Sequence, residues 1–304
     1  MEFGKRSDLS GVSFALPPTP PRSLRALAGT QLSDDGPWLR LGAPVWARRD
    51  WAGKLYPPEA QPREFLRHYA ARLDSIELNA SFYALPEQAT LDGWRAETPE
   101  RFRFCPKVSQ QITHDRGLRG ADEETARFCE RLATLGARLG PALLQLPPWL
   151  APDGLGLVDA FLARLPASFA MAVEFRHAAW FVGGALRPDA LTVLERRGAS
   201  AVITDVAGRR DACHASLTAP EVMVRFVGNA GHATDTPRVE AWIERLIAWR
   251  KEGLRSAYFF VHQPDNLLAP ELLAVATDAA RARGVALPPL PLHPGQLDLF
   301  GAQR

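Results

Sequence analysis

The chain has 304 residues, of which 46% are hydrophobic, and its 36 basic and 34 acidic residues leave a formal net charge of +2. This balance excludes the strongly basic surface that lets a protein bind nucleic acid without being recruited to it. No apolar run approaches the ~20 residues that span a bilayer, and no secretory signal is recognisable, so we expect a soluble cytoplasmic protein.

Residues 1–36 contain the sequence PPTPP and little periodicity, so we expect them to form a flexible leader. From Trp38 onward, short apolar runs alternate with helical patterns. The predicted strands are residues 38–46, 76–79, 102–108, 141–148, 169–176, 199–205, 221–228 and 256–263. The predicted helices are residues 63–73, 90–97, 122–139, 155–165, 188–197, 237–252 and 270–283.

Eight strands that alternate with helices indicate the α/β class, and they favour a single-domain TIM-type (β/α)8 barrel over an open sheet. We expect this barrel to occupy residues 37–288 and a proline-rich tail to follow at residues 289–304. Residues 206–220, between the sixth and seventh strands, have no full helical pattern. Cys105, Cys129 and Cys213 follow no metal-binding spacing, which suits a reducing compartment.

Polar residues stand where most of these strands end. In a TIM-type barrel the carboxyl ends of the strands surround the active site, so these side chains should converge. We therefore expect substrate to be bound by Glu77, Asn79, Tyr83, His114, Gln145, Arg176 and Arg225. The assignment depends on strand register, because a slip of one residue turns a side chain to the other face of the sheet.

Four residues have the chemistry of catalytic groups: Glu174, Asp205, Lys107 and His177. Either carboxylate has the chemistry of a general acid or base, and Glu174, Asp205 and His262 together would hold a divalent metal ion. A buried lysine binds phosphate or acts as a base once its pKa falls. Structural ion pairs, such as Glu174 with an arginine or Lys107 with Glu77, are the alternative reading of the same residues.

Several motifs, in order, resemble those of the YecE-like family, also called domain of unknown function 72. They are IELNASFYALP, FRFCPKV, ITH, LGPALLQLPP and VEFRHAAW, and the resemblance extends over residues 38–283. Membership in this family implies an eight-stranded TIM-type barrel and supplies no reaction. The chain differs from the family pattern at GAPVW in the first strand and at His262 and Gln263 in the eighth.

The tail contains the pentapeptide QLDLF, formed by Gln296, Leu297, Asp298, Leu299 and Phe300. It resembles the motif by which bacterial replication and repair proteins bind the sliding clamp. In such a complex, Leu299 and Phe300 would enter an apolar pocket while the Gln296 amide makes directed hydrogen bonds. The alternative is that these apolar residues fold back onto the barrel.

Three functions agree with these observations. The first is a DNA-associated protein docked on the sliding clamp, acting as a metal-assisted hydrolase on nucleic acid or a nucleotide. The second is an isomerase or lyase of a small phosphorylated or sugar-like substrate. The third is a ligand-binding module without catalysis.

Overall fold

The computed structural model describes residues 4–32, 36–290 and 292. Within these residues, eight parallel strands form one sheet in the order β3-β2-β1-β10-β9-β8-β5-β4. The strands are β1 (Leu39–Ala43), β2 (Ser75–Leu78), β3 (Arg103–Pro106), β4 (Ala142–Gln145), β5 (Met171–Glu174), β8 (Ser200–Asp205), β9 (Glu221–Val227) and β10 (Ser256–His262). A short hairpin of β6 (Phe181–Val182) and β7 (Ala185–Leu186) follows β5.

The two outer strands of this sheet, β3 and β4, meet and close the barrel. Phe104 pairs with Leu139 and Lys107 pairs with Leu143 in parallel bridges. The amide of Val108 donates to the carbonyl oxygen of Leu143 at 2.9 Å, and the amide of Gly140 donates to that of Phe104 at 2.8 Å. The TIM-type barrel predicted from the sequence is therefore confirmed.

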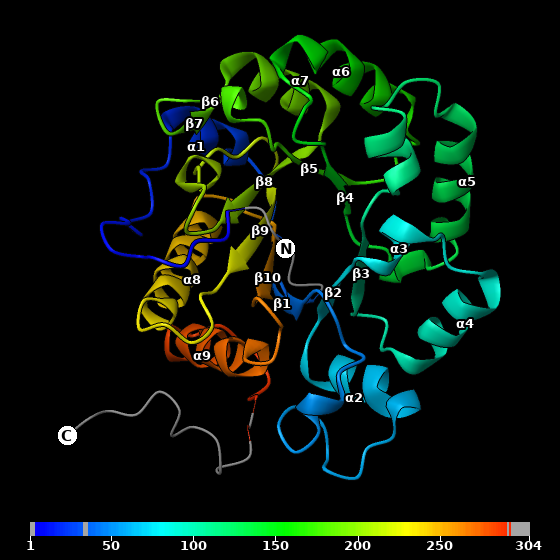
Figure 1. Cartoon of the computed structure of the whole chain (residues 1–304), viewed down its shortest axis with the longest axis vertical. Coiled ribbons are helices and arrows are strands. Elements are labelled where there is room, and N and C mark those ends of the chain that lie inside the picture. Colours follow the sequence, from blue (N-terminus) through cyan, green and yellow to red (C-terminus); the bar gives the residue numbers. More distant parts are fainter. Residues whose placement is uncertain (1–3, 33–35, 291, 293–304) are drawn as a thin grey trace.

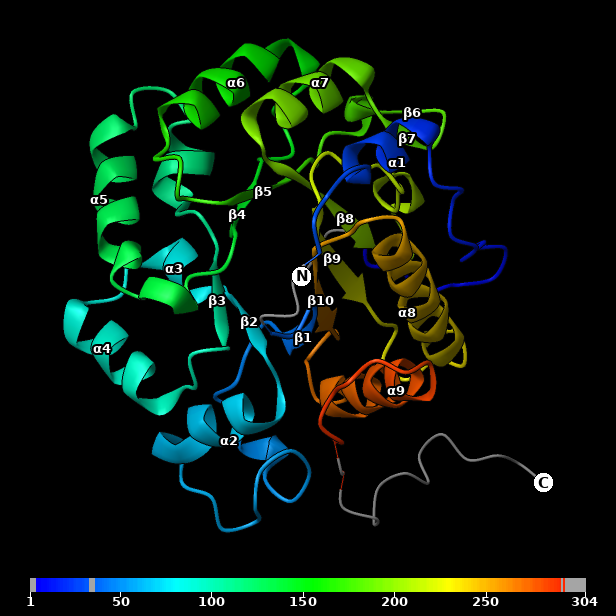
Figure 2. The ribbon, with the colours of Figure 1, turned by 180° about the vertical axis from the view of Figure 1, so that it is seen from behind.

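Helices cover the outside of the barrel (Figures 1 and 2). They are α2 (Phe65–Arg72), α4 (Gln88–Glu97), α5 (Asp122–Ala133), α6 (Leu155–Arg164), α7 (Pro188–Arg197), α8 (Asp235–Lys251) and α9 (Ala269–Ala282), with a short α3 (Ala80–Tyr83) after β2. All seven predicted helices are present, with ends shifted by a few residues and the one from 122 ending early. In the described part of the chain, no helix is both long enough and apolar enough to span a membrane.

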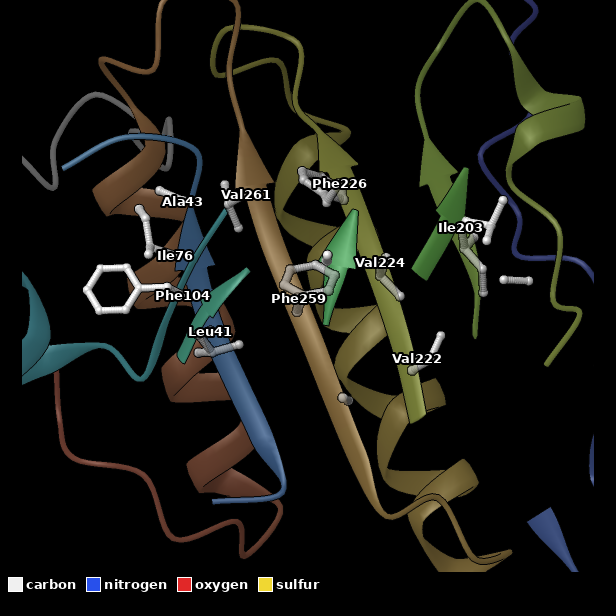
Figure 3. Packing of buried hydrophobic residues seen from close by; sticks show 14 of the residues in the cluster. Leu41, Ala43, Ile76, Phe104, Ile203, Val222, Val224, Phe226, Phe259 and Val261 are labelled. Carbon is white, nitrogen blue, oxygen red and sulfur yellow. The ribbon is translucent and has the colours of Figure 1, made fainter. Parts of the chain in front are cut away.

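Strand alternation separates two buried layers. Residues such as Ile203, Val224 and Phe259 face the surrounding helices, and Figure 3 shows this layer on neighbouring strands. The residues next to them along each strand, such as Val202, Met223 and Phe260, form a separate cluster inside the barrel. This period of two decides which polar side chains at the strand ends point into the barrel.

The connection between β8 and β9 contains a short turn of helix at Arg210–Ala212 and no longer helix. The leader lies along this side of the barrel, and its helix α1 (Pro21–Leu27) is next to the β6-β7 hairpin and α8 in Figure 1. Arg22 binds Glu195 on α7 at 2.7 Å, and the indole of Trp249 on α8 donates to Thr19 at 2.8 Å.

We expected residues 1–36 to be flexible because they have little periodicity. The structure instead places residues 4–32 against the barrel wall, where Leu27 is fully buried. The leader covers the wall where no helix follows β8, and a segment that packs onto a preformed surface needs no helical period of its own. The tail motif at residues 296–300 lies outside the described residues.

Candidate active site

A cavity of about 1240 Å³ opens at the carboxyl ends of the strands. Residues at the carboxyl ends of all eight strands line it, and the sequence predicted six of the lining residues: Asn79, Tyr83, Lys107, Gln145, Arg176 and His262. The cavity is large enough for a metabolite of ordinary size. The convergence of these strand ends is therefore as expected for a barrel of this type.

Beneath the cavity, three charged side chains form one buried network. Arg225 donates from Nε to Oε2 of Glu77 at 2.8 Å and from Nη2 to Oε1 at 2.9 Å. Its remaining Nη1 donates to both carboxylate oxygens of Glu174, at 3.1 and 3.0 Å. Arg225 and Glu77 are fully buried, and none of the three belongs to the described cavity lining. The network supports the floor of the site.

The carboxylates of this network stay ionised. Burial would raise the pKa of Glu77, but the charge of Arg225 and the hydrogen bonds from Arg225 and His262 outweigh burial and hold it well below its usual value. At Glu174, burial is likewise outweighed by the charges of Arg176 and Arg225, which lower its pKa to about 2. Carboxylates that are fully paired and ionised hold their partners in place and are poorly suited to act as general acids.

Lys107 is a cavity residue with altered acid–base chemistry. Its Nζ lies 3.9 Å from the centre of the Phe82 ring. Burial lowers the pKa of Lys107 to about 8, and the charge of Arg225 adds to this effect. Among the described residues, no carboxylate lies within ion-pair distance of Lys107, and with a pKa of about 8 a minority of the amine is neutral near physiological pH.

His262 lies between the network and the cavity. Its Nε2 is 3.0 Å from Oε2 of Glu77, and burial lowers the pKa of His262 although Glu77 opposes this shift. Because an ionised carboxylate only accepts hydrogen bonds, the neutral ring donates from Nε2 and leaves the lone pair on Nδ1. Asn79 donates to the other oxygen of Glu77 at 2.9 Å.

Two residues at the rim have different surroundings. Tyr83 lines the cavity and is 80% exposed. His114 packs against Phe82, with the two ring centres 5.2 Å apart, and its Nδ1 is 2.8 Å from the Thr113 hydroxyl. Burial and the charge of Lys107 lower the pKa of His114. His114 is therefore part of the Lys107 environment and is not among the described lining residues.

The structure does not bring Asp205 to the cavity. The Asp205 carboxylate faces α8, where it accepts from Arg238 at 2.8 Å and from the indole of Trp242 at 2.7 Å. Arg210 also binds this carboxylate. The neighbouring Thr204 is the β8 residue that points inward, and it donates to Glu174. Successive side chains of a strand point to opposite faces, so a shift of one residue decides whether Asp205 or Thr204 points into the barrel.

The predicted metal ligands therefore do not share one space. Glu174 is bound by Arg225 and Arg176, Asp205 lies on the outer side of the sheet, and only His262 lines the cavity. Nor do the described residues contain any group of three histidine, cysteine, aspartate or glutamate side chains arranged to hold a metal ion. The donor set does not fit the divalent metal that the sequence suggested.

His177, the fourth predicted catalytic residue, has a local structural contact. Its Nδ1 accepts a hydrogen bond from the amide of Ala179 at 3.2 Å at the start of a short helical turn. Arg176, next to it, does reach the cavity, and its Nη2 donates to Gln145 at 2.8 Å and to Glu174 at 3.0 Å.

Sequence reasoning missed several residues of the site. Phe82 and Thr204 are ordinary core-type residues in the sequence, and only their contacts with Lys107 and Glu174 identify them. Asn229 and Gln263 line the cavity from loops after β9 and β10. Residues 4–10 of the leader also line it, and no sequence signal points to that role.

Comparisons with known proteins agree with this architecture. The family described as "Protein of unknown function DUF72" matches residues 40–294. The UPF0759 protein YecE of Escherichia coli K12 is 31% identical over 280 residues, which cover 86% of this chain and all of that protein. The UPF0759 protein YunF of Bacillus subtilis is 30% identical over 152 residues, covering 47% of this chain and 52% of that protein.

Solved structures share the fold. A DUF72 family protein from Enterococcus faecalis V583 has a TM-score of 0.65 at 19% identity, covering 86% of this chain and all of that one. Another, from Thermotoga maritima, has a TM-score of 0.60 at 21% identity, covering 81% and 97%. These matches confirm the resemblance to YecE-like proteins drawn from the sequence motifs.

Proposed function

This chain belongs to the DUF72 family of proteins of unknown function, and we propose that it catalyses proton transfer on a small anionic carbonyl compound, such as a phosphorylated sugar, with Lys107 as the base. The observation that carries this proposal is the Lys107 amine. It lies on the cavity wall and has a pKa of about 8, lowered mainly by burial. General bases are most effective when their pKa is close to the working pH.

The other cavity groups suit an anionic, polyhydroxylated ligand. The Arg176 guanidinium supplies positive charge at the floor, and Asn79 and Gln145 supply amide groups beside it. Planar guanidinium groups bind phosphate or carboxylate oxygens through directed hydrogen bonds. Because Glu77 and Glu174 are neutralised by Arg225 and Arg176, their charges do not repel such a ligand.

The proposed step conserves atoms and electrons. The neutral Lys107 amine takes a proton from the carbon next to the carbonyl group, and the electron pair of that C–H bond moves into the carbonyl to give an enediolate. Arg176 stabilises the negative oxygen. The proton of the α-hydroxyl group moves to the enediolate oxygen, and the lysine ammonium returns its proton to the former carbonyl carbon. The former α-carbon thereby becomes the new carbonyl carbon, which completes an isomerisation.

Exchange of carbon-bound protons with deuterium tests this step without knowledge of the product. Aldose and ketose phosphates would be incubated with the protein in D2O, and loss of the α-proton signal would be followed by NMR. We expect exchange of at least one compound, rising through about pH 8 as Lys107 loses its proton. Lys107→Met should slow the exchange by about 100-fold or more.

The control variant is Lys251→Met, which removes an exposed lysine at the end of α8 and should leave exchange unchanged. Equal exchange by Lys107→Met and the native protein would refute the role of the amine. If phosphates bind, and protect Lys107 from acylation, while no proton is exchanged, the chain is a ligand-binding module without this chemistry.

A second candidate function is supported by the tail. The motif QLDLF at residues 296–300 resembles the pentapeptide with which bacterial proteins bind the sliding clamp. Docking there would place the chain in the cytoplasm beside DNA under replication or repair, where the cationic cavity would meet nucleotides or nucleic-acid phosphates. Recruitment by the clamp would also raise the local concentration of this chain at DNA, which a net charge of +2 is too small to do by electrostatic attraction.

Binding to the host's purified sliding clamp tests this candidate by calorimetry. The double variant Leu299→Ala plus Phe300→Ala should lose a micromolar affinity, because it removes the apolar anchors, whereas Gln303→Ala in the same tail should keep it. A native chain that does not bind the clamp at all would eliminate this candidate and leave the proposal for the barrel unaffected.

A further inference from the structure

The leader contributes one side of the cavity. Residues 4–10, here called the strap, line it together with the strand ends. The family match begins only at residue 40, so the strap lies outside the part of the chain that the family describes.

Two glycines hold the end of the strap against the loop after β8. The amide of Gly208 donates to the carbonyl oxygen of Gly4 at 2.9 Å. Gly4 has a φ of +68°, and a Cβ there would come within 2.7 Å of Val206. A side chain at either glycine would separate the two segments, so this close approach depends on both.

Farther along the leader, Phe14 fixes the path of the chain towards the strap. Its ring lies 4.5 Å from the guanidinium carbon of Arg238 and 5.2 Å from that of Arg210. Both arginines bind the buried carboxylate of Asp205. Asp205, which the sequence suggested as catalytic, thus holds the two cations on which the leader rests.

The strap brings positive charge to the mouth of the cavity. Lys5 and Arg6 are exposed and line it, whereas Lys107 and Arg176 belong to its inner wall. Asp8 on the same segment accepts from the amide of Ser10 at 2.8 Å. Two groups of cations, one from the strap and one from the barrel, therefore border a single cavity.

We infer that the strap is a lid built into this chain and that it selects ligands with two separated anionic groups, one for Lys107 and Arg176 and one for Lys5 and Arg6. The ligand part of this inference rests on the proposed function, whereas the lid part rests on the contacts of Gly4, Gly208 and Phe14.

The lid is tested with Gly208→Ala. The three nearest atoms to a new Cβ at Gly208 all belong to Gly4, with the carbonyl oxygen only 2.7 Å away, so this methyl group displaces the strap. Gly156→Ala is the matched control, because that exposed helical glycine has open space around it. The readout is the rate at which acetic anhydride acylates Lys107 in the full chain, measured by peptide mass spectrometry.

We expect Gly208→Ala to raise the acylation rate of Lys107 severalfold and Gly156→Ala to leave it at the native value. Equal rates in all three proteins would overturn the lid. Acylation of Lys251, an exposed lysine, calibrates the reagent in each sample.

The ligand part is tested with fructose 6-phosphate and fructose 1,6-bisphosphate by calorimetry. The native chain should bind the bisphosphate about tenfold more tightly, because charge-assisted hydrogen bonds form at both ends. Lys5→Gln plus Arg6→Gln should abolish this preference and keep the affinity for the monophosphate. Arg25→Gln, an exposed change on α1 that also removes one positive charge from the leader, should keep the preference.

The outcomes separate the two proposals. A native chain that binds neither phosphate contradicts the anionic substrate of the proposed function, and the acylation rates then still decide the lid. Binding of both phosphates with equal affinity, or a preference that survives the double variant, refutes selection by the strap and leaves the proposed chemistry of Lys107 intact.

Discussion

Arg225 binds Glu77 through two parallel hydrogen bonds of 2.8 and 2.9 Å, although 148 positions separate the two residues in the sequence. Neither side chain is exposed. Glu174 binds the remaining nitrogen of the same guanidinium, so one arginine joins two carboxylates at the centre of the barrel. The floor of the cavity depends on this arrangement.

Removal of Arg225 should destabilise the protein more than neutralisation of one of its partners. Arg225→Met leaves Glu77 and Glu174 buried together without their common cation, and a loss of about 3–5 kcal/mol in the free energy of unfolding is expected. Glu77→Gln keeps the shape and one carboxylate for Arg225, so its loss should be smaller. Urea unfolding monitored by circular dichroism measures both.

The matched control is Arg67→Met, which breaks an exposed ion pair with Glu97. Exposed pairs contribute about 0–1 kcal/mol, so this variant should unfold near the native midpoint. A loss for Arg225→Met no larger than that for Arg67→Met would refute the structural role of the network.

Stability should fall as the solution becomes acidic. The folded pKa values of Glu77 and Glu174 lie below their ordinary values, the second at about 2, so their contribution is complete above about pH 5 and is lost towards pH 2. The pKa of His262 is also lowered, so the unfolded chain takes up a proton there first as the pH falls through about 6.5. Unfolding midpoints in urea between pH 7 and pH 3 should decrease throughout.

The variant Glu174→Gln separates this effect from general acid sensitivity. It should be less stable than the native protein at pH 7, and the difference should shrink as the pH approaches 3. A difference that is constant with pH would contradict the lowered pKa of Glu174.

Lys107 should lower the stability of the folded protein at neutral pH. Its folded pKa of about 8 lies below the ordinary value because burial disfavours the ammonium form, whereas water solvates that form freely in the unfolded chain. At neutral pH this difference lowers the free energy of unfolding. Lys107→Met should therefore raise the free energy of unfolding by about 1–3 kcal/mol at pH 7. The gain should disappear above about pH 10, where the lysine is neutral in both states.

Asp205 should be needed to hold the leader. Asp205→Asn weakens its bonds to Arg238 and Arg210, the residues under Phe14, and so should speed tryptic cleavage after Lys5 and Arg6. Asp189→Asn, which affects an exposed pair with Arg187, is the control and should be cleaved at the native rate. Limited proteolysis with mass spectrometry measures the rates. Unchanged cleavage in Asp205→Asn would show that the leader is held independently of this carboxylate.

Local sequence patterns were enough to predict the barrel and six of the residues that line its cavity. Strand and helix periods are local properties of the chain, and in a closed parallel barrel the strand ends must converge. Lys107, Arg176 and His262 were therefore predictable as cavity residues, and they line it.

The surroundings of each of these groups depend on tertiary contacts. Asp205 faces α8 and Thr204 faces Glu174 because strand side chains alternate, and the exact register depends on pairing with neighbouring strands. The bond between Arg225 and Glu77 and the course of the leader across the wall join residues far apart in the sequence. Such contacts depend on charge balance and packing in three dimensions, which leave no period in the sequence.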